Sequence, residues 1–360
     1  MMLQQSIRVA QIILPCRNLA AMLAFFTGTL GFRVNMIVPA DAPATAVISG
    51  YGTLLRLEAD AAAPESTLTL RLLCDLAALP AGTPHHLTAP DGTRVELVEA
   101  QPPMFVPEGS QEFVVSRNDD AEAWGTGRAG MQYRDLIPGR LGGRFIASHI
   151  RIPQGGPVPD YVHFHKVRFQ MIYCKTGWAK LVYEDQGESF LLEAGDCVLQ
   201  PPEIRHRVLE SSDGLEVIEI GCPAVHETFA DHNMTLPTGR DFPKRDFGGQ
   251  RFVRHIAAKA IWAPWRAKGF EARDIGIAAA TDDLAGVRVT RPISGTTETS
   301  LAHDGEFLFF FVLKGSLVLE IAGRGEQRLI EGDSCTIPSG SRLILRPSAD
   351  LNLLDVTLPA

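Results

Sequence analysis

The sequence predicts a mainly β protein in which two antiparallel β-barrels follow a small α+β domain of βαβββ order. Three observations support this prediction. The 360 residues include 33 glycines and 24 prolines, a content that favours many short strands joined by tight turns. Apolar and polar residues alternate along most segments after residue 108, as in half-buried strands. These segments also occur twice, about 140 residues apart, which indicates a duplicated domain and is too long a period for a solenoid.

Composition excludes several classes of protein. The net charge of −8 is spread along the chain without a basic block, so we expect neither nucleic acid nor a membrane surface as a partner. No apolar run reaches the roughly 20 residues that span a bilayer, and the first residues do not resemble a secretory leader. The six cysteines form no CxxC pair, which favours free thiols in a reducing compartment. We therefore expect a cytoplasmic protein.

Residues 1–102 form the predicted α+β domain. An alternating strand, IRVAQIILP, precedes a helix expected over residues 19–30, with Asn18 as its N-cap and Gly31 after its end. Strand-like runs follow at residues 33–38, 45–49 and 54–58. The stretches NLAAMLAFFTGTLGFRV and APDGTRVELVEA resemble the vicinal oxygen chelate family, which includes glyoxalase and bleomycin-resistance proteins.

That resemblance implies metal ligands at Gln11, Glu58 and Glu96. The family's first-strand histidine is missing, however, and the second half of this domain has no clear helix. We therefore expect a metal-free module.

A proline-rich linker at residues 102–107 leads to the duplicated region. We expect barrel one over residues 108–235, a linker over 236–250 and barrel two over 251–360. Arg134-Asp135 in the first copy matches Arg273-Asp274 in the second. Two glycine turns also match, Gly177 with Gly315 and Gly195-Asp196 with Gly332-Asp333.

The strongest motif lies between Gly156 and Glu210. His163 and His165 are two residues apart, so on a strand both imidazoles point to one face. Gln170 follows five residues later, and His206 comes after a turn from Gly195 to Pro201. This spacing resembles the cupin family over both copies, about 240 residues. The resemblance implies jelly-roll barrels and one divalent transition metal, Fe, Mn, Ni or Zn, held inside barrel one by His163, His165, Gln170 and His206.

The chain departs from the family pattern at three positions. Gln170 replaces the usual glutamate, Glu203 stands where glycine is common, and Glu210 stands where asparagine is common. Exchanging a carboxylate for an amide removes one negative charge. We therefore expect weaker metal binding, a stronger Lewis acid and better tolerance of an anionic substrate.

Barrel two has lost most of these residue types. Leu301, His303, Leu308 and Leu343 stand at the four matching positions. One imidazole does not hold a metal, so we expect a structural barrel, or one that binds something without a metal.

Other side chains near the motif are candidates for catalysis. On the strand RFIASHIRIP, His149 and Arg151 share one face, and Arg151 would bind a substrate carboxylate if that face is inside. The alternative is a solvated face of the barrel. Tyr161 and Tyr173 are candidate proton or hydrogen-bond donors. The segment HETFADH, residues 226–232, either covers the cavity mouth or a partner subunit, or is a solvated loop.

The cupin resemblance implies an enzyme. We expect a dioxygenase-type oxidoreductase acting on a small oxygenated compound, an aromatic or dicarbonyl acid. Two alternatives remain: a non-redox isomerase or lyase acting on a sugar acid or keto acid, and a small-molecule binding or sensing protein. By analogy we expect a homodimer, unless the two barrels pack on each other within one chain.

Overall fold

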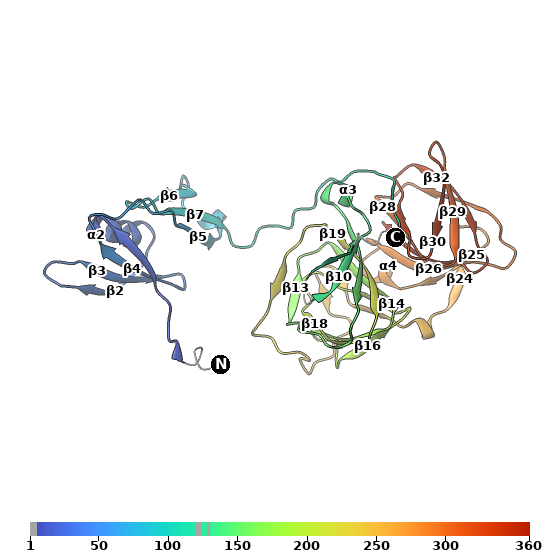
Figure 1. Cartoon of the computed structure of the whole chain (residues 1–360), viewed down its shortest axis with the longest axis horizontal. Helices are drawn as coiled ribbons and strands as arrows, with labels where there is room; N and C mark the ends of the chain where they lie inside the picture. The colour runs from blue at the N-terminus through green and yellow to red at the C-terminus, as the bar shows by residue number, and fades with distance from the viewer. Residues whose placement is uncertain (1–5, 120–123, 128–129) are drawn as a thin grey trace. The chain divides into compact units, whose positions relative to one another are not determined.

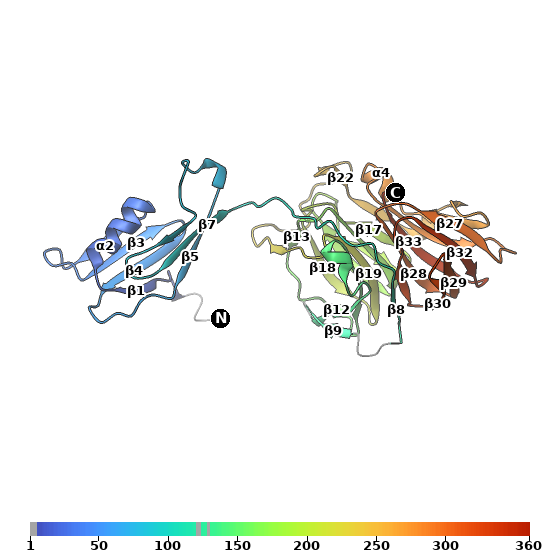
Figure 2. The same ribbon diagram turned by 90° about the horizontal axis from the view of Figure 1, so that it is seen from above.

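The computed structural model describes residues 6–119, 124–127 and 130–360. The chain divides into two compact units, Met1–Pro103 and Met104–Ala360, and each is described by itself (Figures 1 and 2). Within these described ranges, no helix is long and apolar enough to cross a membrane. The six cysteines are free thiols, as the sequence predicts.

The first unit contains two small sheets, a helical segment formed by α2 and η1, and a short 3-10 helix, η2. Asn18 caps the helix, as predicted, because its side chain accepts a hydrogen bond from the Ala21 amide at 3.0 Å. The helical segment covers one face of the first sheet, where Met22 and Phe26 are buried against Leu55. The first sheet has the order β1-β4-β3-β2 and the second β5-β7-β6, and β1–β4 and β5–β7 are parallel pairs. The elements are β1 (Ile12–Cys16), α2 (Leu19–Ala24), η1 (Phe25–Thr29), β2 (Arg33–Val38), β3 (Thr45–Gly50), β4 (Thr53–Ala59), β5 (Thr69–Cys74), η2 (Leu76–Ala78), β6 (His86–Thr88) and β7 (Arg94–Glu99).

Barrel one is formed by two facing sheets. The larger sheet has the order β23-β17-β14-β19-β11-β10-β9, and the smaller β16-β15-β18-β13-β20, with β12 paired to β18. The strands are β9 (Trp124–Thr126), β10 (Gln132–Asp135), β11 (Ile146–Ile152), β12 (Gly156–Pro157), β13 (His163–His165), β14 (Phe169–Thr176), β15 (Trp178–Tyr183), β16 (Phe190–Glu193), β17 (Cys197–Leu199), β18 (His206–Ser211), β19 (Leu215–Cys222), β20 (Thr228–Ala230) and β23 (Val253–His255). A short helix, α3 (Arg140–Gly143), precedes β11.

Barrel two repeats this plan. Its sheets have the orders β24-β25-β26-β33-β28-β31-β8 and β27-β32-β29-β30. The strands are β8 (Val114–Ser116), β24 (Trp262–Pro264), β25 (Phe270–Asp274), β26 (Gly286–Pro292), β27 (Thr299–His303), β28 (Phe307–Lys314), β29 (Ser316–Ile321), β30 (Gly325–Ile330), β31 (Ser334–Thr336), β32 (Ser341–Pro347) and β33 (Asn352–Leu358). Two short helices, η5 (Ala257–Lys259) and α4 (Ile277–Ala280), flank β24 and β25. The predicted mainly β fold with two barrels is confirmed.

The two barrels exchange strands with each other. Strand β8 precedes barrel one in the sequence but pairs with β31 of barrel two, and β23 from the start of the second copy pairs with β17 of barrel one. Each copy also contributes the matched arginine. Arg134 donates to the Gly332 carbonyl at 2.6 Å, and Arg273 donates to the Gly195 carbonyl at 3.0 Å. Each arginine therefore binds the Gly-Asp turn of the other barrel.

A continuous apolar core joins the barrels. Phe145 of barrel one stacks on Phe307 of barrel two with ring centroids 4.1 Å apart, and residues such as Ile218 and Val356 are fully buried in the same cluster. The larger sheets thus bury their outer faces against each other, a burial that stabilises by roughly 25 cal/mol per Å² of apolar surface. The two barrels form one structural unit.

The segment between the copies is ordered by barrel one. Thr238, Arg240 and Arg245 each donate a hydrogen bond to Asp185, at 2.5–2.8 Å. Asp185 lies in the turn after β15 and is almost fully buried. A short hairpin of β21 (Asp246–Phe247) and β22 (Gln250–Arg251) follows.

Candidate metal centre

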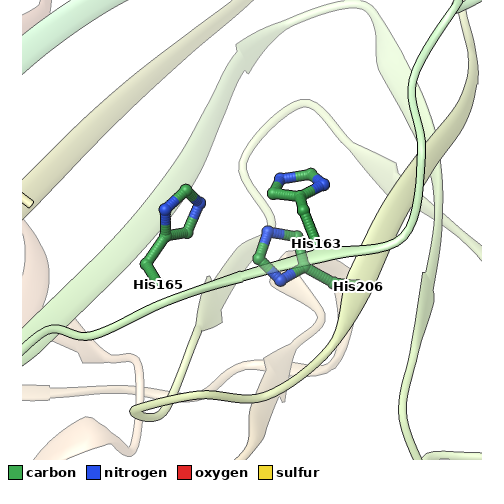
Figure 3. Close-up of side chains that lie close together, drawn as sticks. All are labelled: His163, His165 and His206. Carbon is green, nitrogen blue, oxygen red and sulfur yellow. The ribbon is translucent and has the colours of Figure 1, made fainter. Parts of the chain in front are cut away.

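Three histidines meet at one point inside barrel one. His163 and His165 lie on β13, and His206 at the start of β18 is paired with His163 in the strand register. One ring nitrogen from each lies within 4.8 Å of the others, and all three residues are buried. Figure 3 shows the three rings gathered around a common space. Strand alternation and cross-strand pairing therefore bring together the three histidines that the sequence singles out.

Backbone carbonyls fix the tautomer of each ring. The Nδ1 of His163 lies 2.8 Å from the Tyr161 carbonyl oxygen. For His206 the Nδ1 lies 3.0 Å from the Ile204 carbonyl, and for His165 the distance to the Glu227 carbonyl is 3.3 Å. A carbonyl only accepts, so Nδ1 carries the proton and Nε2 keeps its lone pair. This second layer of contacts is typical of metal-binding imidazoles, and the residues present fit a divalent transition metal.

Gln170 on β14 lies beside this cluster, and a carboxylate holds its amide. Its Nε2 donates to Oε1 of Glu219 on the neighbouring strand β19 at 2.5 Å. Because the nitrogen is engaged there, the amide oxygen is the end left to serve a metal. Glu219 was missed by the sequence reasoning, since its contact with Gln170 depends on the pairing of β14 with β19.

A second buried amide was also missed. Gln200 follows β17, is 1% exposed, and its Nε2 lies 2.8 Å from Nε2 of His206. Its Oε1 is buried without a hydrogen-bond partner, which is unusual for a buried polar atom. The signal in the sequence is the matching position in barrel two, Ile337, since only one copy is polar there.

The histidines open onto a cavity of about 100 Å³. Its walls are largely aliphatic, from residues such as Ile150, Ile172, Ala179 and Leu181. Its polar lining comes from the three histidines, Gln170, Gln200, Glu219 and Tyr133.

Arg151 does not face this cavity. Ile150 and Ile152 on β11 line it, so alternation turns Arg151 to the other face, where its guanidinium lies 4.0 Å from the Trp124 ring and donates to Gln132 at 2.5 Å. The interpretation of Arg151 as a carboxylate-binding residue inside the barrel is therefore wrong, because the apolar face of β11 is the inner one.

The two tyrosine candidates are also placed outside the cavity. Tyr173 lies in the core between the barrels, where its hydroxyl is 3.4 Å from Arg273 and burial raises its pKa to about 12. It therefore does not serve as a proton donor to a ligand of the histidines. Tyr161 is 40% exposed, and its ring lies 5.9 Å from that of His163 on the outer side of the cluster.

The segment after β19 covers the histidine strand. Residues 228–230 form β20, an edge strand paired with β13 so that Thr228 lies opposite His165. The His226 ring lies 5.3 Å from that of His165, and its Nδ1 is 2.9 Å from the Pro223 carbonyl. Part of the segment is thus an edge strand that supplies a carbonyl to His165, although most of its side chains are exposed.

Backbone conformation explains one departure from the family pattern. Glu203 has a φ of +60°, and the matching residue of barrel two is Gly340 with a φ of +76°. Glycine adopts this left-handed region at little cost, whereas a residue with a Cβ is strained there. Barrel one therefore keeps the turn before His206 despite the glutamate.

Among the described residues of barrel two, apolar side chains stand where barrel one has its histidines. Leu301 pairs with Leu343 where His163 pairs with His206, and Phe310, Leu317 and Leu319 are fully buried. His303 is the remaining imidazole, and burial lowers its pKa to about 4, so it is neutral near pH 7.

In the first unit the three positions implied by the family resemblance lie apart from one another. Glu58 pairs with Arg56 at 2.6 Å, and Glu96 pairs with Arg71 at 2.8 Å. Gln11 is exposed just before β1. Both carboxylates are thus engaged by arginines.

Comparison with known proteins shows the fold. No protein-family model matches the sequence, and no curated protein matches it. Among solved structures, protein Ylba from E. coli is 12% identical with a TM-score of 0.50, over 71% of this chain and 94% of that chain. Salicylate 1,2-dioxygenase from Pseudaminobacter salicylatoxidans is 16% identical with a TM-score of 0.51, over 71% and 86%. This likeness shows the fold of the second unit, which is a two-barrel cupin fold.

Proposed function

We propose that barrel one is the active site of a metal-dependent cupin enzyme, a dioxygenase-type oxidoreductase acting on a small oxygenated compound. The observation that supports this most is the convergence of three histidines with fixed tautomers at a cavity large enough for a small substrate. His163, His165 and His206 would hold the metal through Nε2, and Gln170 would complete the set through its amide oxygen. The similarity in fold to a salicylate 1,2-dioxygenase, also solved with gentisate, adds support.

In this proposal a bound iron supplies the activation of O2, and both oxygen atoms enter the product. The residues of the chain do the rest. The aliphatic walls exclude water, and the carbonyls of Tyr161, Ile204 and Glu227 keep the imidazoles in one tautomer. The Gln200 amide donates to Nε2 of His206, the nitrogen that would bind the metal. Metal binding would therefore require Gln200 to release this nitrogen, and its amide would then donate to a ligand beside His206.

Oxygen uptake tests the proposal. Protein loaded with Fe(II) should consume O2 when a small hydroxylated aromatic or a diketone is added, and His206→Ala should abolish this uptake. Metal content gives a separate readout, and we expect close to one metal per chain in the wild type. A content below about 0.1 per chain that His206→Ala does not change would contradict the site and favour a metal-free binding protein.

One observation favours a second function. The Glu219 carboxylate lines the cavity, which suits proton transfer in a non-redox isomerase or lyase whose metal acts as a Lewis acid. Turnover under strict anoxia, or with zinc as the only metal, would support this alternative over the dioxygenase.

A further inference from the structure

The family pattern has a glutamate where this chain has Gln170, and a carboxylate is present on the neighbouring strand β19, at Glu219. The exchange of glutamate for Gln170 would by itself leave a ligand set without a carboxylate. Glu219 supplies one, since it lines the cavity and accepts the hydrogen bond of Gln170 at 2.5 Å. The centre of barrel one therefore does not lose its negative charge, and the expectation that it tolerates an anionic substrate better does not follow.

In the part of the chain that the structure describes, no cationic side chain lies beside this carboxylate, so a bound metal would be the cation near it. Among the residues that the structure describes, no lysine or arginine lines the cavity and none forms an ion pair with Glu219. The nearby cation-bearing side chain on β11, Arg151, points to the other face. An anionic ligand group that does not bind the metal would thus face Glu219 and aliphatic walls without a cationic side chain, which is costly.

In barrel two, the residue that matches Glu219 is an aspartate with an arginine beside it. Asp355 matches Glu219, because Glu219 pairs with Ser148 and Asp355 with Arg288 at the same place in the two sheets. Asp355 is fully buried, and Arg266 donates to it at 3.1 Å. The duplicated position is acidic in both copies, but only barrel two gives it an arginine.

The size of the cavity limits the ligand as well. The cavity is about 100 Å³ and lined mainly by aliphatic side chains, so it is smaller than the roughly 150 Å³ of an engineered apolar cavity that holds benzene. A single ring is therefore the upper limit, and its polar substituents would have to extend towards the histidines or the cavity mouth.

We propose that barrel one selects a neutral, ring-sized compound that has no carboxylate, that coordinates the metal through oxygen, and that donates a hydrogen bond from a hydroxyl or amine to Glu219. The proposal rests on the proposed function in one respect, the presence of the metal. Glu219 acts as a specificity determinant through its charge, and it holds Gln170 in the orientation described above.

Two aromatic probes of nearly equal size test the charge rule. Catechol carries two adjacent hydroxyls, and salicylate carries a hydroxyl and a carboxylate. We expect zinc-loaded wild-type protein, in which no oxidation occurs, to bind catechol at least about tenfold more tightly than salicylate by calorimetry. The variant Glu219→Gln keeps the shape of the side chain but removes its charge. It should reduce the preference for catechol over salicylate to about threefold or less.

Two variants serve as controls. Glu193→Gln removes a carboxylate that points outward from β16, next to the cavity-lining Leu192, and should leave the ratio unchanged. Ala179→Leu introduces the residue of barrel two, Leu317, and should remove the binding of both probes while the zinc content stays constant.

The outcomes separate the two proposals. A wild-type ratio below tenfold, a ratio that Glu219→Gln does not change, or failure of both probes to bind overturns the charge rule while leaving metal binding intact. Failure to bind zinc overturns the proposed metal centre instead. In that case the affinities for catechol and salicylate are measured on the metal-free protein, whose cavity retains Glu219 and the aliphatic walls. The ratio of the two affinities, in the wild type and in Glu219→Gln, then tests the charge rule by itself.

Discussion

Barrel one and barrel two share one architecture and differ in what fills it. The positions of His163, Gln170 and His206 in barrel one are occupied by Leu301, Leu308 and Leu343 in barrel two. The equivalence follows from the strand registers, which are the same in both barrels. The cavity walls follow the same trend, with Ala179 against Leu317 and Ile172 against Phe310.

The two copies of the duplicated domain have different roles. Larger apolar side chains close barrel two, whose core of fully buried residues stabilises the pair. Smaller side chains and polar groups leave barrel one with an open centre. The strand exchange and the shared core then let the filled barrel support the open one.

Replacing one histidine by the residue of barrel two should give the largest effect. His163→Leu removes a metal ligand but keeps a side chain that the matching strand pair, Leu301 with Leu343, accommodates. We expect a loss of metal affinity of more than about 100-fold with little change in circular dichroism. Metal analysis after dialysis measures this. Retention of one metal per chain would show that His163 is not a ligand.

The matched acidic residues should differ in what they stabilise. Asp355→Asn weakens the buried pair with Arg266 and should lower the free energy of unfolding by about 2 kcal/mol. Within the described part of the chain, Glu219 has no arginine partner. Glu219→Gln should therefore lower the free energy of unfolding by less than about 1 kcal/mol. Urea denaturation of both variants checks this order. An equal or larger loss for Glu219→Gln would contradict the distinction between the two positions.

The pH dependence of stability should come in part from His149, for which barrel two has Val289. Burial lowers the pKa of His149, and its hydrogen bond lowers that of Glu216 to about 2. Both groups take up protons less readily in the folded than in the unfolded state. Their stabilisation is therefore complete above about pH 6.5 and is lost as the pH falls towards 2.

His149→Val tests this effect by giving barrel one the residue of barrel two. The variant should flatten the dependence of the unfolding free energy on pH below about 6.5, because the lowered pKa of His149 no longer contributes. Thermal or urea unfolding across this range measures the slope. An unchanged slope would assign the acid sensitivity to other groups.

The smallest effect concerns the turn before His206. Glu203→Gly introduces the residue of barrel two, Gly340, at a positive φ, and should stabilise the protein by about 0.5–1 kcal/mol. Chemical denaturation with metal content as a control is sufficient. A destabilised variant would mean that the glutamate side chain makes contacts that outweigh the backbone strain.

Much of the molecule follows from local patterns in the sequence. The duplication, the short strands, the cap at Asn18 and the pair of histidines on β13 depend on spacing along the chain, which strand and helix periodicities convert directly into faces. The exchange of strands between barrels was not visible, because β8 and β23 are short segments whose partners lie far away in the sequence.

The sequence by itself determined which residues share a face and which copy keeps three histidines. Only the tertiary structure decided which face of β11 is inside, a choice that removed Arg151 from the cavity, because alternation defines two faces without orienting them. It also brought Gln200 and Glu219 to the histidines from the larger sheet, which faces the sheet that carries β13 and β18. Contacts of this kind depend on strand register and barrel closure, which no short window of sequence encodes.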